Sequence, residues 1–147
     1  MKLEAVDWKT LAPEVFRVFE AQPPLLTAGD RSGCNTMTVG WCQLGTLWGR
    51  PVCTVYVRPE RYTYEFMEKH NHFTLSVLPA DAKKITALCG ARSGREVDKI
   101  RECGLTVRYG AEDAPFFEEA ELALVCRKLY VQDLSAGCVR EESAILP

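Results

Sequence analysis

Short stretches rich in β-branched and aromatic residues recur along this chain, and each is followed by glycine, proline or other turn-forming residues. We expect strands at residues 25–28, 36–42, 52–57, 72–78, 105–109 and 121–130. Gly45, Gly49 and Pro51 interrupt the pattern between the second and third of these segments, so we interpret that stretch as a loop. The order lacks the regular strand-helix alternation of a parallel doubly wound sheet. The sequence therefore predicts a mainly β, antiparallel barrel with a few short helices.

Helical spacing of apolar residues is confined to short segments. It predicts helices around residues 8–19, over residues 63–69, and from an Asp81 cap towards Cys89. A further helix start is predicted at Ser93 and Glu96, which have capping-box spacing, with Gly104 as the C-terminal stop of that helix.

Composition limits the class of protein. The chain has 147 residues, of which 47% are hydrophobic and 26% charged, and no repeat or linker divides it, so a single folded domain over residues 1–147 is expected. A net charge of -2 gives no broad positive field, which disfavours nucleic-acid binding. The first residues lack an apolar run, and the seven cysteines are an odd number without Cys-x-x-Cys pairs. We expect a cytoplasmic protein with reduced thiols and no membrane segment.

Familiar catalytic motifs are absent: there is no nucleophile elbow, no phosphate loop and no Gly-x-Gly-x-x-Gly. His70 and His72 are the only histidines and have no other ligands at metal-binding spacing, so we expect no metal site. Cys34 and Cys89 lie beside polar segments, where a reactive role is conceivable, but we expect them to be small core residues and not catalytic ones.

Polar residues gather at three places where strands or helices are expected to end. The first cluster is Asn35, Thr36, Met37 and Thr38; the second contains Arg58, Arg61, Tyr62 and Thr63; the third contains Ser93, Gly94, Arg95 and Lys99. Hydroxyls, cations and free amides at a helix start bind anions. Each cluster also has an ordinary explanation: strand-forming threonines, a solvated turn capped by Thr63, or a capped, salt-bridged helix face. Because the chain has no net positive charge, the three together indicate a phosphorylated small molecule.

Longer segments that contain these clusters resemble the flavin reductase-like, FMN-binding split-barrel family, particularly its flavoredoxin-type branch. The resemblance rests on NTMTVGW at residues 35–41, LGTLWGRPVCTVYVRPERYTYEF at 44–66, CGARSGREVDK at 89–99 and ELALVCRKLYVQDL at 121–134. It implies a Greek-key split β-barrel that forms a homodimer and holds FMN near the subunit interface.

The resemblance also assigns roles to the three clusters. It implies that Asn35 to Thr38 line the isoalloxazine and ribityl region of FMN, that the second cluster contacts ribityl or phosphate, and that the third closes the phosphate end. The implied activity is electron transfer from NAD(P)H through FMN to a small-molecule acceptor or a redox partner protein, with no side-chain acid, base or nucleophile. A non-enzymatic FMN-binding redox module or electron carrier is the alternative. Family members commonly continue beyond the strand that ends near Leu134, so we expect that a piece of the usual barrel is missing at the C-terminus.

Overall fold

The computed structural model describes residues 3–7, 22–134 and 136–139. Its strands are β1 (Leu25–Asp30), β2 (Gly33–Thr38), β3 (Cys42–Leu47), β4 (Arg50–Val55), β5 (His72–Val77), β6 (Val107–Tyr109), β7 (Pro115–Phe117) and β8 (Leu122–Arg127). Its helices are α2 (Tyr62–Lys69), α3 (Lys83–Ala91), α4 (Lys99–Glu102) and the short 3-10 turns η2 (Ala111–Asp113) and η3 (Ala136–Cys138). The helix expected around residues 8–19 lies outside the described residues.

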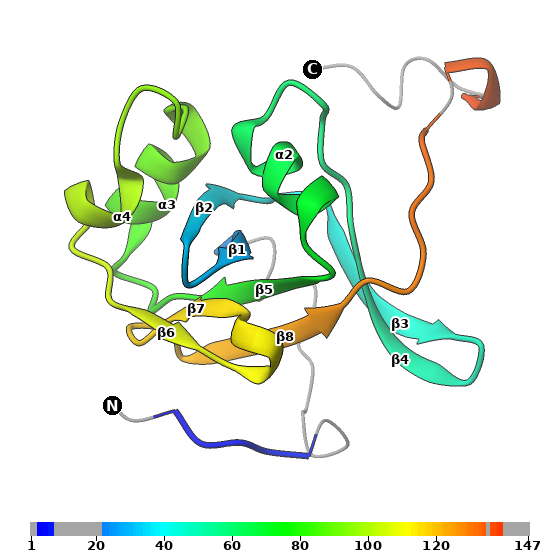
Figure 1. The fold of residues 1–147 in the computed structure, drawn as a ribbon, viewed down its shortest axis with the longest axis horizontal. Helices are drawn as coiled ribbons and strands as arrows, with labels where there is room; N and C mark the ends of the chain where they lie inside the picture. Colours follow the sequence, from blue (N-terminus) through cyan, green and yellow to red (C-terminus); the bar gives the residue numbers. More distant parts are fainter. Residues whose placement is uncertain (1–2, 8–21, 135, 140–147) are drawn as a thin grey trace.

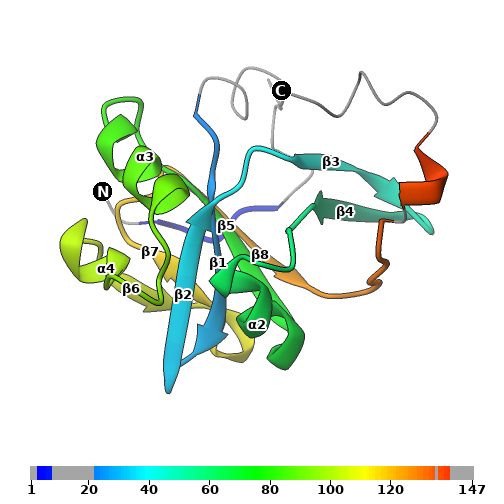
Figure 2. The ribbon, with the colours of Figure 1, turned by 90° about the horizontal axis from the view of Figure 1, so that it is seen from above.

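A four-stranded antiparallel sheet in the order β2-β1-β5-β8 forms the centre of the fold (Figure 1). The hairpin β3-β4 projects from it, and β6-β7 forms a second small sheet. Seen from above, α2 lies on one side of β2, and α3 and α4 lie on the other (Figure 2). The expected antiparallel, mainly β architecture is confirmed.

Strand β1 of the central sheet is buried on both faces. Adjacent residues of a strand point to opposite sides, so its side chains reach two different clusters. Leu25 on β1 belongs to an apolar cluster with Cys89 and Phe117, whereas its neighbour Leu26 belongs to a second cluster with Met37 and Leu75. Each fully buried leucine contributes about 1.5–3 kcal/mol to folding. A continuous buried run such as this is typical of a strand covered on both sides.

The stretch predicted as one strand over residues 36–42 is interrupted, and the predicted loop after it is mostly a hairpin. The chain turns after Thr38, where the main-chain N–H of Val39 donates to Pro24 O at 3.0 Å, and β3 begins at Cys42. Trp48 (φ 51°) and Gly49 (φ 66°) form the tight connection to β4. Positive φ at both central residues suits a two-residue hairpin turn. Gly45 and Pro51 thus belong to strands outside the central sheet, where proline is tolerated.

The predicted helix start at Ser93 was wrong. The helix begins at Lys99, and its N-cap is Asp98, whose side chain accepts a hydrogen bond from the N–H of Arg101. Glu96 directs its N–H to the main-chain oxygen of Ser93 in a turn. The predicted stop was correct: Gly104 has φ +64° and directs its N–H to Arg101 O. A left-handed glycine at this position closes a helix because it has no Cβ.

Other predicted elements agree with the structure to within a few residues. The first predicted helix after β4 corresponds to α2, and the next begins at Lys83 with Ala82, not Asp81, as its N-cap. Strand β7 was not predicted, because its three residues are too few to show a period.

Candidate functional site

A cavity of about 270 Å³ lies where β2, the start of α2 and the segment after α3 meet. It gathers residues of all three predicted polar clusters: Met37, Arg58, Arg61, Tyr62, Thr63, Ser93, Gly94 and Lys99. The structure adds Glu60, Ala91, Arg92 and Glu96 to its lining. A second cavity of about 280 Å³ adjoins it and shares Gly94, Glu96 and Lys99; Asn35 and Arg95 line that second cavity.

The first predicted cluster is divided by the alternation of β2. Asn35 faces α2, where its Nδ2 donates to the hydroxyl of Thr63 at 2.7 Å, and Met37 lies on the same face. Thr36 and Thr38 point to the other side: the Thr36 hydroxyl bonds with that of Thr27 at 3.0 Å, and the Thr38 hydroxyl donates to Thr86 O. The side chains of these two threonines therefore do not line the cavity.

The N-terminus of α2 opens onto the cavity without a side-chain cap. Arg61 occupies the N-cap position and makes no cap hydrogen bond. Thr63, which was the cap in the alternative explanation of this cluster, lies inside the helix and is 1% exposed. The first N–H groups of a helix have no partners within it, and they carry the positive end of the helix dipole. This end of the cavity therefore suits an anion.

Cations outnumber carboxylates in the cavity wall. Arg58, Arg61, Arg92 and Lys99 face two acidic residues, Glu60 and Glu96. Arg58 pairs with Glu60 at 3.3 Å and Arg92 with Glu96 at 3.7 Å, and both pairs are exposed. Arg61 donates from Nη1 to Gly90 O at 3.3 Å, near the end of α3. The excess of positive charge is local, since the whole chain carries -2.

Lys99 is a buried cation that hydrogen bonds to two elements of the cavity wall. Its side chain is 5% exposed, and its Nζ donates to the main-chain oxygens of Thr36 and Cys89, each at 2.9 Å. Burial lowers the pKa of Lys99 below its usual value, because the charged form loses hydration. Two of its three N–H donors are used by the protein, so one remains for a ligand.

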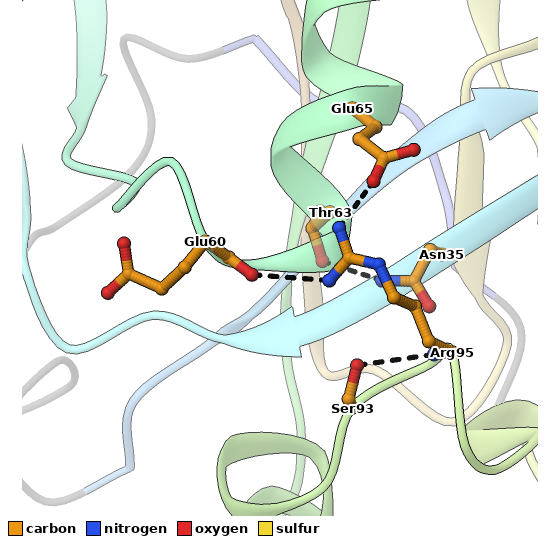
Figure 3. Close-up of polar contacts among 6 residues, drawn as sticks. All are labelled: Asn35, Glu60, Thr63, Glu65, Ser93 and Arg95. Atoms are coloured by element: carbon orange, nitrogen blue, oxygen red, sulfur yellow. Dashed lines mark hydrogen bonds and ion pairs between the residues drawn. The ribbon is translucent and has the colours of Figure 1, made fainter.

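Arg95 spans the gap between the segment 92–98 and α2 (Figure 3). Its guanidinium forms an ion pair with Glu65, donates to Glu60 O at 3.2 Å and lies 4.7 Å from the centre of the Tyr62 ring. Its main-chain N–H donates to the Ser93 hydroxyl at 3.2 Å. Arg95 thus holds the cavity wall together, and in this structure its charge is directed to protein groups.

Comparison with known proteins identifies the fold. The family described as flavin reductase-like domain matches residues 16–137, which is most of the chain. The chain belongs to the flavin reductase-like family. A search of the curated proteins found no match.

Several solved structures are similar to this chain. Flavoredoxin from Methanosarcina acetivorans is 30% identical, with a TM-score of 0.69 over 77% of this chain and 60% of that one. An FMN-binding domain of a flavin reductases-like enzyme from Shewanella baltica is 24% identical, with a TM-score of 0.63 over 80% of this chain and 64% of that one. A putative flavin reductase with a split barrel domain from Shewanella frigidimarina is 20% identical, with a TM-score of 0.66 over 86% of this chain and 68% of that one. The expected split barrel is confirmed, although this chain spans less than two thirds of the first two relatives.

Several residues that line the cavity or contact its wall were not predicted as site residues from the sequence. Glu60 and Arg92 lie within the quoted polar segments, so their proximity to the nominated cations was a usable signal. No sequence signal pointed to Glu65, because only the fold brings α2 beside Arg95.

The histidines are absent from the lining of both cavities. His70 contacts Asp30 (Nε2 to Oδ2, 3.4 Å) and Phe66 O (from Nδ1, 2.9 Å). Over the described ranges, no group of three or more His, Cys, Asp or Glu side chains is placed to hold a metal ion. Within those ranges, no helix is long and apolar enough to cross a membrane.

Proposed function

We propose that this protein binds FMN and acts as an NAD(P)H-dependent flavin reductase. The observation that carries the proposal is the cation-rich cavity at the uncapped start of α2, where three arginines and one lysine face two carboxylates. A phosphate dianion at a helix N-terminus is stabilised by free N–H groups and by the dipole, and arginine binds it bidentately. The residues present therefore fit the phosphate of FMN.

The chain's own groups would bind and orient the cofactor. Arg58 and Arg61 would contact ribityl or phosphate, while Lys99 and Ser93 would close the phosphate end. Met37 lines this cavity, and Asn35, on the same face of β2, lines the adjoining one, so these are the side chains of the first cluster that would meet FMN. Bound FMN would supply the redox chemistry, accepting electrons from a nicotinamide and passing them to a second acceptor.

The cavity of about 270 Å³ lies just below the range of roughly 300–1,000 Å³ usual for complete small-molecule sites. The phosphate end of FMN fits this volume, and the rest of the cofactor needs additional surface. We propose that a second subunit supplies it. Trp48, 66% exposed, and Tyr130, 62% exposed, contact each other with ring centres 6.1 Å apart. Exposed aromatic surface of this kind is typical of protein interfaces.

Flavin absorbance tests the cofactor and the reaction together. We expect freshly purified protein, loaded with FMN and freed of excess, to keep oxidised-flavin bands that bleach with NADH or NADPH under anaerobic conditions. Arg58→Ala should weaken FMN retention at least tenfold, since a lost charge-assisted contact is worth about 1.5–3 kcal/mol. The exposed Arg127 lies outside the cavity lining, so Arg127→Ala is the matched control. Equal retention in both variants would refute the phosphate assignment.

A non-enzymatic electron carrier is the second candidate, favoured by the similarity to a flavoredoxin at 30% identity. Retained flavin bands that do not bleach with either nicotinamide, but do bleach with dithionite, would establish the carrier. Steady-state oxidation of NAD(P)H would exclude it.

Light scattering after size-exclusion chromatography tests the dimer. We expect a mass of twice 16.5 kDa, and a monomer for Trp48→Arg. Val6 is similarly exposed at 63% but lies in the separate segment 3–7, so Val6→Arg should stay dimeric. A wild-type monomer would refute the shared site.

A further inference from the structure

Two of the four cations in the cavity wall are paired with carboxylates of the same wall. Arg58 Nε lies 3.3 Å from Glu60 Oε1, and Arg92 Nε lies 3.7 Å from Glu96 Oε2. The other two lining cations donate to neutral main-chain oxygens. Each carboxylate therefore neutralises one of the arginines that surround the cavity.

Local turns hold each carboxylate beside its arginine. The N–H of Arg61 donates to Arg58 O at 3.0 Å, which closes a turn that contains Glu60. Glu96 donates its N–H to a main-chain oxygen three residues earlier, and this turn follows directly after Arg92, the C-cap residue of α3. All four paired side chains are more than half exposed. Exposed ion pairs are weak, so a stronger anionic ligand can open them.

A phosphate monoester is a stronger ligand for these arginines than a carboxylate. It carries more than one negative charge at neutral pH, and the arginine guanidinium binds either anion bidentately. An arginine that binds the phosphate must give up its carboxylate, however. That carboxylate stays tethered to the same turn and repels the bound anion. Both effects lower the affinity of the cavity for phosphate.

We propose that Glu60 and Glu96 are internal competitors of the ligand's phosphate. Each carboxylate holds one arginine until a phosphate monoester displaces it, and each thereby limits the affinity of the site. The inference rests on the proposed function, because it takes this cavity as the phosphate site of FMN. The two glutamates act through Arg58 and Arg92, so they are positioning residues that determine how tightly the cofactor is held.

Removing one negative charge at a time tests this competition. Glu60→Gln and Glu96→Gln keep the shape of the side chain, and the main-chain oxygen of Glu60 can still accept from Arg95 (Figure 3). We expect each variant to bind FMN about threefold more tightly in a fluorescence titration, as the loss of one exposed ion pair implies. Riboflavin lacks the phosphate, so its affinity should be the same for the wild type and both variants.

Glu118 supplies the matched control, because it forms an exposed ion pair with Arg108 and lines neither cavity. Glu118→Gln should leave the affinities for FMN and riboflavin unchanged. Unchanged or weaker FMN binding in either cavity variant, or an equal gain for riboflavin, would overturn the proposal. Glutamates that only supported the fold would weaken binding when replaced, so a gain in affinity is a result that a structural role does not produce.

Inorganic phosphate separates this inference from the proposed function. For each protein, the thermal unfolding midpoint is measured in phosphate and in chloride at equal ionic strength, since a ligand that binds the folded state raises the midpoint. We expect a larger phosphate-dependent rise for Glu60→Gln and Glu96→Gln than for the wild type or Glu118→Gln. Proteins that follow this order but bind no FMN would refute the flavin site alone. Proteins that bind FMN without following this order would refute the internal competition alone.

Discussion

The ammonium group of Lys99 donates a 2.9 Å hydrogen bond to the main-chain oxygen of Thr36, which joins the start of α4 to β2 at the edge of the central sheet. The same group bonds to Cys89 O on α3. One side chain thus holds together three elements that surround the candidate cofactor cavity.

Replacing this cation should destabilise the fold. Lys99→Met keeps most of the apolar stem but leaves two buried carbonyls without their donor, so we expect a loss of about 1–3 kcal/mol in the free energy of unfolding. Lys84 is exposed on α3, and Lys84→Met should change stability by less than about 0.5 kcal/mol. Urea denaturation measures both values, and equal midpoints for the two variants would contradict the role assigned to Lys99.

Gly94 is required by a close approach. A Cβ at this position would lie 2.0 Å from Asn35 Oδ1 and 3.0 Å from Tyr62 Cδ1. Gly94→Ala should displace Asn35, break its hydrogen bond to Thr63 and cost about 1–3 kcal/mol. The corresponding space at Gly45 is open, so Gly45→Ala is the control, with a change below about 0.5 kcal/mol. Thermal or urea unfolding of the two variants distinguishes these values.

Arg95 and Glu65 should act as one unit. Because they form an ion pair that connects the segment 92–98 to α2, Arg95→Ala and Glu65→Ala should weaken FMN retention by similar factors, and the double variant by little more than either alone. Fluorescence titration with FMN measures this cycle. If Arg95 instead served as a phosphate ligand restrained by Glu65, Glu65→Ala would tighten FMN binding while Arg95→Ala weakened it.

Asp30 predicts a specific dependence of stability on pH. Hydrogen bonds from the Ser32 side chain and from its main-chain N–H, the latter at 2.7 Å, hold the pKa of Asp30 below its usual 3.8. The unfolded chain therefore takes up the proton more readily, so this contribution is complete above pH 3.8 and is lost as the pH falls through the folded-state pKa.

The stability difference between the wild type and Asp30→Asn should therefore shrink as the pH falls from about 5 through 3.8. Urea denaturation across this range measures the difference. Ser32→Ala removes the hydroxyl donor and should flatten the acid-side change. A difference that stays constant down to about pH 2 would rule out the Ser32 contribution.

Some elements of the fold were predicted correctly from the sequence, and one helix start was not. The strand at β5 and the glycine stop at Gly104 were predicted, because each depends on alternation or backbone freedom within a few residues. The capping box at Ser93 failed, because the segment 92–98 is held by Arg95 and Gly94 against α2, and these contacts outweigh the local capping preference.

The sequence by itself determined the mainly β class, the family resemblance and the polar residue types that surround the cavity. Only the tertiary structure decided that Asn35 and Met37 face α2 while Thr36 and Thr38 point away, because strand alternation fixes opposite faces but not which face meets the cavity. It likewise decided that Lys99 meets Thr36 and that Asn35 meets Thr63. These partners are far apart in the chain, and they come together because strands and helices must bury their apolar faces against one another.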